Sequence, residues 1–88
     1  MTVEIKDFYA TWCTPCKRVL PILDKLTELY PDLVVTKIDV EEHPELAEQY
    51  KVKGVPSVFF EKDGVVVDKV VGGGPISFYL DILNKIYE

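Results

Sequence analysis

Two cysteines, Cys13 and Cys16, are separated by two residues and are the only cysteines in the chain. They follow an alternating segment and open a segment of helical periodicity, which places both thiols on neighbouring positions of one helix face. At this spacing the two sulfurs can bond or part with little backbone movement. A pair that cycles between dithiol and disulfide carries electrons, so the pattern indicates redox chemistry.

The two thiols are expected to have different roles. Unpaired N–H groups and the helix dipole stabilise a thiolate where a helix begins, so the pKa of Cys13 should lie below that of a free thiol. Cys13 is then the nucleophile, and Cys16, one turn further and more shielded, resolves the mixed disulfide. Pro15 costs no hydrogen bond in the first turn and stiffens it, Trp12 offers an apolar flank for a partner chain, and Thr14 is small and polar at the exposed tip.

The same four residues have other possible uses. A Cys-x-x-Cys segment can be half of a zinc site, but zinc needs four ligands and His43 is the only further soft candidate. An intersubunit metal or cluster held by two such segments is also conceivable. A purely structural disulfide would add little stability, because the loop it closes is very short.

Two charged residues share the apolar parity of their strands. Asp7 lies on the parity of Val3 and Ile5, which predicts a carboxylate facing inward behind the cysteines. Lys37 has the parity of the neighbouring strand's apolar residues, and two buried charges on adjacent strands suggest a coupled pair. Burial should raise the pKa of Asp7 and make it a candidate base for the Cys16 proton. The alternative for Asp7 is that it ends a fraying strand and its side chain faces solvent. The alternative for Lys37 is likewise a side chain that faces solvent.

The sequence predicts strands at 2–9, 33–40, 55–60 and 65–71 and helices at 13–30 and from 75 onward. Pro44, which suits a first helical turn, predicts a further helix at 44–51. Apolar residues recur along the first helix: Val19, Leu20, Leu23, Leu26 and Leu29. Lys62-Asp63-Gly64 predicts a hairpin between the last two strands. The βαβ-αββα order gives an α/β fold with a four-stranded mixed sheet and helices on both faces.

Size and charge narrow the possible partners. A chain of 88 residues supports one small domain, residues 1–88. A net charge of -5 argues against nucleic acid and anionic membranes as partners. Without a signal-peptide or membrane-span pattern, we expect a soluble, cytoplasmic monomer. From the residues alone, Val55-Pro56 is expected to be trans, and Gly72-Gly73-Gly74 to be a loose turn.

Five segments together resemble thioredoxin, over nearly the whole chain. They are residues 7–17, Pro21, Lys37-Ile38-Asp39, Gly54-Val55-Pro56-Ser57 and Gly72. The resemblance implies the thioredoxin fold, with Cys13 as nucleophile, Cys16 as resolving thiol, Asp7 as buried proton acceptor and Lys37 as its modulator. It also implies a cis Val55-Pro56 bond facing the cysteines and a shallow groove formed by the Val55 backbone, Trp12 and Gly72. Such a protein would need no cofactor beyond the Cys13–Cys16 disulfide, and its partners would be disulfide-containing proteins and a thioredoxin reductase.

Three features depart from the family pattern. Thr14 replaces the usual glycine after the first cysteine, which we expect to affect the redox potential or the fit of partners. The resemblance begins at what would be the family's second strand, a minimal form similar to glutaredoxin and the small archaeal-type thioredoxins. Gly73-Gly74-Pro75 extends the usual single glycine. The function expected is reduction of protein disulfides; the alternatives are a glutathione-dependent glutaredoxin-like reductase and a binding module that does not use its thiols.

Overall fold

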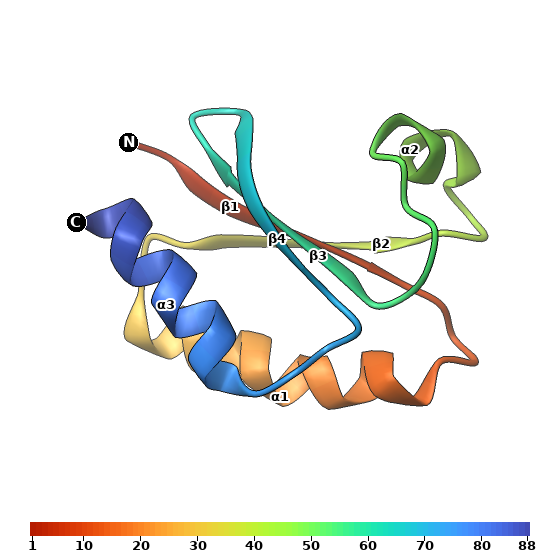
Figure 1. The fold of residues 1–88 in the computed structure, drawn as a ribbon, viewed down its shortest axis with the longest axis horizontal. Coiled ribbons are helices and arrows are strands. Elements are labelled where there is room, and N and C mark those ends of the chain that lie inside the picture. The colour runs from red at the N-terminus through yellow and green to blue at the C-terminus, as the bar shows by residue number, and fades with distance from the viewer.

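The computed structural model describes all 88 residues. Its elements are, in order, β1 (Val3–Tyr9), α1 (Thr14–Leu29), β2 (Val34–Asp39), α2 (Pro44–Gln49), β3 (Ser57–Lys62), β4 (Val65–Val71) and α3 (Ile76–Tyr87). The predicted βαβ-αββα order is therefore confirmed, as Figure 1 shows.

The four strands form one mixed sheet in the order β2-β1-β3-β4. β1 runs parallel to β2 and antiparallel to β3, and β3 is antiparallel to β4. β1 is an internal strand of the sheet. Its carboxyl end leads directly into the segment that carries the cysteines. The predicted mixed sheet is confirmed.

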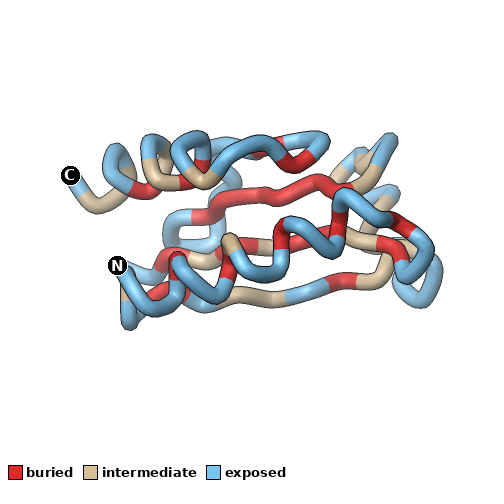
Figure 2. The backbone as a smooth tube through the Cα atoms, turned by 90° about the horizontal axis from the view of Figure 1, so that it is seen from below, coloured by how far each residue is buried: buried red, intermediate tan, exposed pale blue.

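The helices cover both faces of the sheet, as expected. On one face, buried side chains of α1 and α3 form the main core with β1, β3 and β4. On the other face, Phe8, Ile38 and Phe59 form a smaller cluster against residues of α2 and the loop after it. Burial is continuous over most of β3 and recurs at helical spacing along α1 (Figure 2). None of the three helices has the length and apolarity that a membrane crossing requires.

The structure differs from the expected elements in two details. β3 begins at Ser57, two residues later than predicted, because a proline at position 56 has no N–H to give to the sheet. Leu20 and Leu29 are 38% and 49% exposed, so including them in the apolar stripe of α1 was wrong. The buried stripe of α1 is narrower and consists of Cys16, Val19, Leu23 and Leu26.

The turn between β3 and β4 confirms the predicted hairpin. Asp63 and Gly64 have φ angles of 51° and 85°, which matches the left-handed pair of a tight hairpin turn. Only glycine adopts such an angle without cost, and aspartate is among the residues that tolerate it best.

Lys51 also has a left-handed backbone, with a φ of 56°. It follows α2, where the N–H of Lys51 donates to the carbonyl of Glu48 at 3.0 Å and the N–H of Val52 donates to that of Ala47 at 2.8 Å. This is the Schellman arrangement that ends many helices, and glycine is the usual residue at the left-handed position. A lysine there is strained.

We expect Lys51→Gly to raise the free energy of unfolding by about 1 kcal/mol, because glycine removes the steric cost of the left-handed conformation. For a domain of this size the midpoint of thermal unfolding should rise by about 4–8 °C. Lys53→Gly is the matched control, since the φ of Lys53 is not positive and the same change there should not stabilise the protein. Equal effects of the two substitutions would contradict the assignment of strain to Lys51.

Candidate redox site

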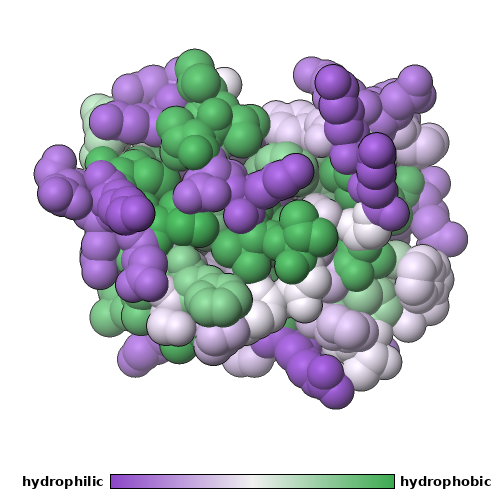
Figure 3. Space-filling model, viewed as in Figure 1, coloured by the Kyte–Doolittle hydropathy of each residue, from purple (hydrophilic) through white to green (hydrophobic).

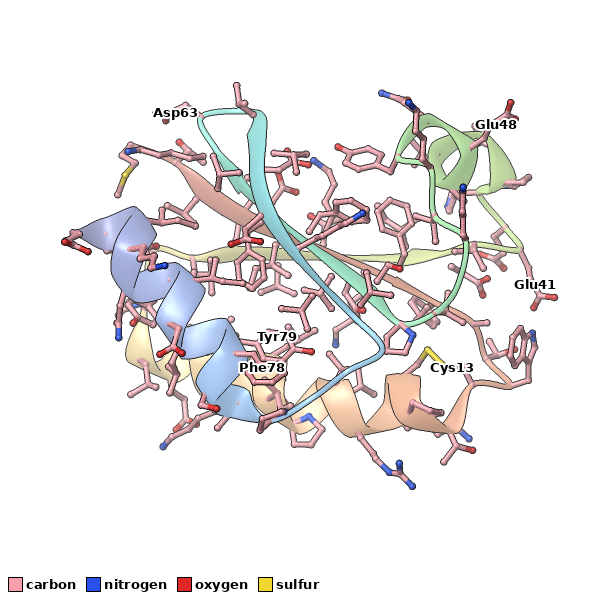
Figure 4. The ribbon with its side chains drawn as sticks, in the orientation of Figure 1. Cys13, Glu41, Glu48, Asp63, Phe78 and Tyr79 are labelled. Carbon is pink, nitrogen blue, oxygen red and sulfur yellow. A yellow bond between two sulfur atoms is a disulfide. The ribbon has the colours of Figure 1, made fainter.

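Cys13 and Cys16 form a disulfide at the amino-terminal end of α1, with their Cα atoms 5.3 Å apart. Cys13 is the N-cap residue, and its Sγ accepts a hydrogen bond from the N–H of Cys16 at 3.2 Å. A donor aimed at a sulfur favours the charged form of that sulfur, as does the positive end of the helix dipole. Figure 4 shows Cys13 at the end of the helix, where the chain arrives from β1.

The predicted difference in shielding between the two cysteines is not present. Cys13 and Cys16 are both 3% exposed, so the expectation of a more shielded Cys16 was wrong for the disulfide form. The physical reason is that both side chains turn inward to pack against Ala10, with Tyr9 and Val55 beside them. A hollow of about 300 Å³ lies next to Cys16, and its lining includes Lys17 and Lys37.

Asp7 faces inward, as its parity predicted. Its side chain is fully buried on the face covered by α1, and neither carboxyl oxygen has a hydrogen-bond partner. Burial raises the pKa of Asp7 to about 6, an effect that the nearby charge of Lys37 partly offsets. Asp7 therefore changes its protonation state close to neutral pH, which a general base at this site requires.

Lys37 has the position that the sequence predicted but not the burial. It lies directly opposite Asp7 in the register of β1 and β2 and lines the hollow beside Cys16. However, Lys37 is exposed and forms no ion pair, so the prediction that its charge is buried was wrong. The expected coupling remains, since the charge of Lys37 lowers the pKa of Asp7. The long side chain of Lys37 carries the ammonium group out to solvent, because an amine is costly to bury without a partner.

The loop before β3 contributes an apolar residue and a free backbone edge. The Val55-Pro56 bond is cis, as the resemblance implied and in contrast to the expectation from the residues alone. The side chain of Val55 packs against the cluster of Ala10, Cys13 and Cys16. Neither the N–H nor the carbonyl of Val55 makes a backbone hydrogen bond within the protein. Both groups are thus available to a partner chain.

Trp12, Thr14 and Pro15 are exposed around the disulfide, and Trp12 exposes 68% of its surface. A tryptophan this exposed on a small protein is a candidate contact for a partner. The exposure of Trp12 and Thr14 agrees with the flank and the exposed tip predicted for them, while the role of all three residues in binding stays a prediction.

The glycine run is held by hydrogen bonds at two points. Gly72, Gly73 and Gly74 have φ angles of 88°, 90° and 86°, which a residue with a side chain would adopt only under strain. The N–H of Gly72 donates to the carbonyl of Pro56 at 2.9 Å. The hydroxyl of the fully buried Tyr79 donates to the carbonyl of Gly73 at 2.9 Å. The segment is therefore more ordered than the loose turn expected from sequence.

The anchoring role of Tyr79 was missed in the sequence, where it counted only as an apolar residue of the last helix. Burial, and secondly the charge of Asp7, raise the pKa of Tyr79 to about 12, so its hydroxyl remains a neutral donor. The sequence contained a signal for this role: a tyrosine on the apolar face of the last helix is buried, and a buried tyrosine hydroxyl usually needs a hydrogen-bond partner. The sequence does not say which carbonyl this partner is.

A second polar cluster lies on the sheet face that α2 covers. Glu61 is 3% exposed, and its carboxylate accepts hydrogen bonds from Lys6 at 2.9 Å and from the Tyr50 hydroxyl at 2.7 Å. These contacts join β1, β3 and the residue after α2, and they do not involve the cysteines. Nowhere does the structure bring three or more His, Cys, Asp or Glu side chains together in a group that could hold a metal ion.

A disulfide at a helix amino terminus, on a four-stranded sheet of this topology, defines a thiol-disulfide oxidoreductase. Comparison with known proteins specifies the family. The thioredoxin family model matches residues 2–84. Thioredoxin from Staphylococcus aureus is 42% identical over 84 residues, which cover 94% of this chain and 81% of that protein.

Two solved structures are similar to this protein over nearly the whole of its chain. A thioredoxin from Halobacterium salinarum NRC-1 has a TM-score of 0.90 and 40% identity, covering 98% of this chain and 75% of the other. The oxidized form of mitochondrial thioredoxin 3 from Saccharomyces cerevisiae has a TM-score of 0.85 and 39% identity, with 93% and 77% covered. The chain belongs to the thioredoxin family, and it is a protein-disulfide reductase that works through the Cys13–Cys16 dithiol.

Proposed function

We propose that the protein acts as a general reductant of other proteins' disulfides, with Cys13 as the attacking thiol and a thioredoxin reductase as its source of electrons. The observation that carries this proposal is the Cys13–Cys16 disulfide at the start of α1, with a buried and unpartnered carboxyl group, Asp7, on the face behind it. Residues 1–88 would act as one domain and as a monomer, and the dithiol would be the only redox group.

In the first step, the Cys13 thiolate attacks one sulfur of a partner's disulfide. The partner's S–S bond breaks, a mixed disulfide between Cys13 and the partner forms, and the partner's other sulfur leaves as a thiolate. The hydrogen bond from the N–H of Cys16 and the end of α1 support the thiolate form of Cys13. Cys13 rather than Cys16 attacks because it occupies the N-cap position.

In the second step, Cys16 loses its proton and attacks the Sγ of Cys13. The mixed disulfide breaks, the Cys13–Cys16 disulfide forms, and the partner leaves with both sulfurs reduced, having gained two electrons. Asp7 takes the Cys16 proton, and Lys37 lowers the pKa of Asp7 toward the range in which the carboxylate is available. The hollow beside Cys16, about 300 Å³, has room for several water molecules at about 30 Å³ each to carry the proton.

The partner would bind as an extended segment across the Cys13 end of the site. The free N–H and carbonyl of Val55 provide main-chain pairing that tolerates many sequences. Trp12 on one side, and Gly72 and Gly73 on the other beside Pro56, would form the rest of the groove. Thr14 and Pro15 would contact the partner from the tip of the helix.

Insulin reduction tests the electron source. With NADPH and a thioredoxin reductase we expect sustained turnover and precipitation of the insulin B chain. With glutathione, glutathione reductase and NADPH we expect little turnover. The reverse result would identify a glutaredoxin-like enzyme. We place this function in the cytoplasm, since two cysteines working as a recycled dithiol suit a reducing compartment.

A further inference from the structure

A pocket bordered by three lysines lies beside the groove, on the sheet face that α2 covers. Its volume is about 370 Å³. Lys51 and Lys53, from the loop after α2, stand on one side, and Lys69 of β4 stands on the other. Ser57 and Phe59, both buried on β3, form its floor. We call this the lysine pocket. Figure 3, in the same view as Figure 1, shows hydrophilic side chains projecting at the α2 end of the molecule, next to apolar atoms.

The three lysines have no carboxylate partners within the protein. Its ion pairs are Lys6 with Glu4 and Glu61, and His43 with Glu45. Glu61, a buried carboxylate on the same strand as Ser57 and Phe59, already accepts hydrogen bonds from Lys6 and Tyr50. Figure 4 shows Glu41 and Glu48 projecting outward at the α2 end of the molecule. Every Lys and Arg side chain except Lys6 lacks an ion pair, so what distinguishes these three is that they border one hollow in a chain of net charge -5.

The backbone that forms one wall of the pocket is strained at Lys51. Lys51 occupies the left-handed position after α2, where glycine would be more stable. Strained residues persist where the surrounding structure holds them, and they concentrate at functional sites. Lys69 is held on the other side, with its Nζ 6.0 Å from the centre of the Phe59 ring. One lysine therefore stands on each wall, Lys51 with a constrained backbone and Lys69 with its ammonium group near the Phe59 ring.

The lysine pocket continues into the partner groove. A neighbouring hollow of about 240 Å³ is lined by Trp12 and Val55, and it shares Val52, Lys53 and Gly54 with the lysine pocket. A partner segment paired with Val55 advances about 3.3 Å per residue. Residues a few positions from its reactive cysteine would therefore lie over Gly54 and between the lysines.

We propose that the lysine pocket binds acidic side chains that flank the target cysteine of a partner protein, so that the protein selects among disulfide substrates by local charge. This inference rests on the proposed reductase function and adds the chemistry of the preferred substrate. Carboxylates of Asp or Glu would pair with the ammonium groups of Lys51, Lys53 and Lys69, and the Phe59 ring in the floor would contact their methylene groups.

The test uses two disulfide-linked peptides that differ only beside the cysteine, with Asp and Glu in one and Asn and Gln in the other. Pre-reduced protein is mixed with each peptide, the reaction is quenched with acid, and free thiols are counted after alkylation. We expect the acidic peptide to react about fivefold faster at low salt, the upper range for an exposed ion pair. The preference should fall toward one near 1 M salt, where charges are screened.

Two triple variants separate the pocket from the overall charge. Lys51→Gln, Lys53→Gln and Lys69→Gln together should remove the preference. Lys25→Gln, Lys62→Gln and Lys85→Gln together remove the same charge from exposed positions elsewhere and should keep it. The single variant Lys51→Gly should weaken the preference in a more stable protein, so that its loss does not reflect unfolding.

Three results would overturn the proposal: equal rates for the two peptides with the unmodified protein, a preference that survives in the pocket variant, or a preference lost equally in both triple variants. The net charge of the protein disfavours the acidic peptide, so long-range attraction does not explain a positive result. If the protein reduces neither peptide, the reductase function itself fails. If it reduces both equally, only the lysine pocket is refuted.

Discussion

Cys13→Ser is expected to abolish the reduction of insulin, with turnover falling on the order of a thousandfold or more. A hydroxyl at this position has a far higher pKa than a thiol, and it cannot form the mixed disulfide on which the reaction depends. The measurement is NADPH oxidation with a thioredoxin reductase, after circular dichroism has verified the fold.

Cys16→Ser is the matched control for this experiment, since it removes the other sulfur of the same disulfide. It leaves Cys13 able to attack but removes the resolving thiol, so the protein should accumulate as a mixed disulfide with its partner. Non-reducing electrophoresis and mass spectrometry detect this species. Accumulation with Cys13→Ser instead of Cys16→Ser would reverse the assigned roles.

Asp7→Asn is expected to slow the resolution step by about a hundredfold near neutral pH, at the lower end of what general base catalysis contributes. Attack by Cys13 should be much less affected, because the proton that Asp7 accepts belongs to Cys16. Stopped-flow mixing with a chromogenic disulfide separates the two steps. Asp24→Asn, an exposed position on α1, controls for the loss of one negative charge.

The pH dependence of the resolution rate gives the decisive readout. With Asp7 present, the rate should rise as pH increases through about 6, the pKa to which burial raises this carboxyl group. That rise should be missing in Asp7→Asn. An identical pH profile for the two proteins would remove Asp7 from the mechanism.

Asp7→Asn should also raise the free energy of unfolding of the oxidized protein at high pH. The pKa of Asp7 is about 6 in the folded protein, compared with an ordinary value of 3.8. Above pH 6 the carboxylate is charged in both states and its burial costs up to about 3 kcal/mol. The penalty declines as pH falls through 6 and is absent below 3.8.

Urea unfolding of both proteins from pH 8 to pH 4 measures this effect. The stability advantage of Asp7→Asn should be largest at pH 8 and shrink as the solution becomes acidic. The asparagine amide, itself buried, adds an offset that does not vary with pH. A difference in stability that is constant across the range would show that Asp7 ionises normally in the folded protein.

Local patterns accounted for the elements and much of the site. Strand and helix periods together with Pro44 at the start of α2 placed all seven elements, and the Asp63-Gly64 pair marked the hairpin. The spacing of Cys13 and Cys16 indicated a redox pair, and the parity of Asp7 placed its carboxyl inward. These features depend on residues close together in the chain, where backbone geometry determines which side chains share a face.

The contacts that complete the site depended on packing between distant segments. Lys37 had inward parity, yet its flexible side chain reaches solvent, because a solvated ammonium is more stable than a buried and unpaired one. The N–H of Gly72 meets the carbonyl of Pro56 only because β3 and β4 pair side by side.

The sequence by itself therefore determined a βαβ-αββα fold and a dithiol at the start of a helix, with an inward carboxyl nearby. Only the tertiary structure decided that Val55 keeps a free backbone edge and that Lys51, Lys53 and Lys69 surround one pocket. Periodicity is a property of neighbouring residues, whereas a pocket forms where a loop and a strand far apart in sequence come together. The selectivity proposed for the lysine pocket rests on that second kind of information.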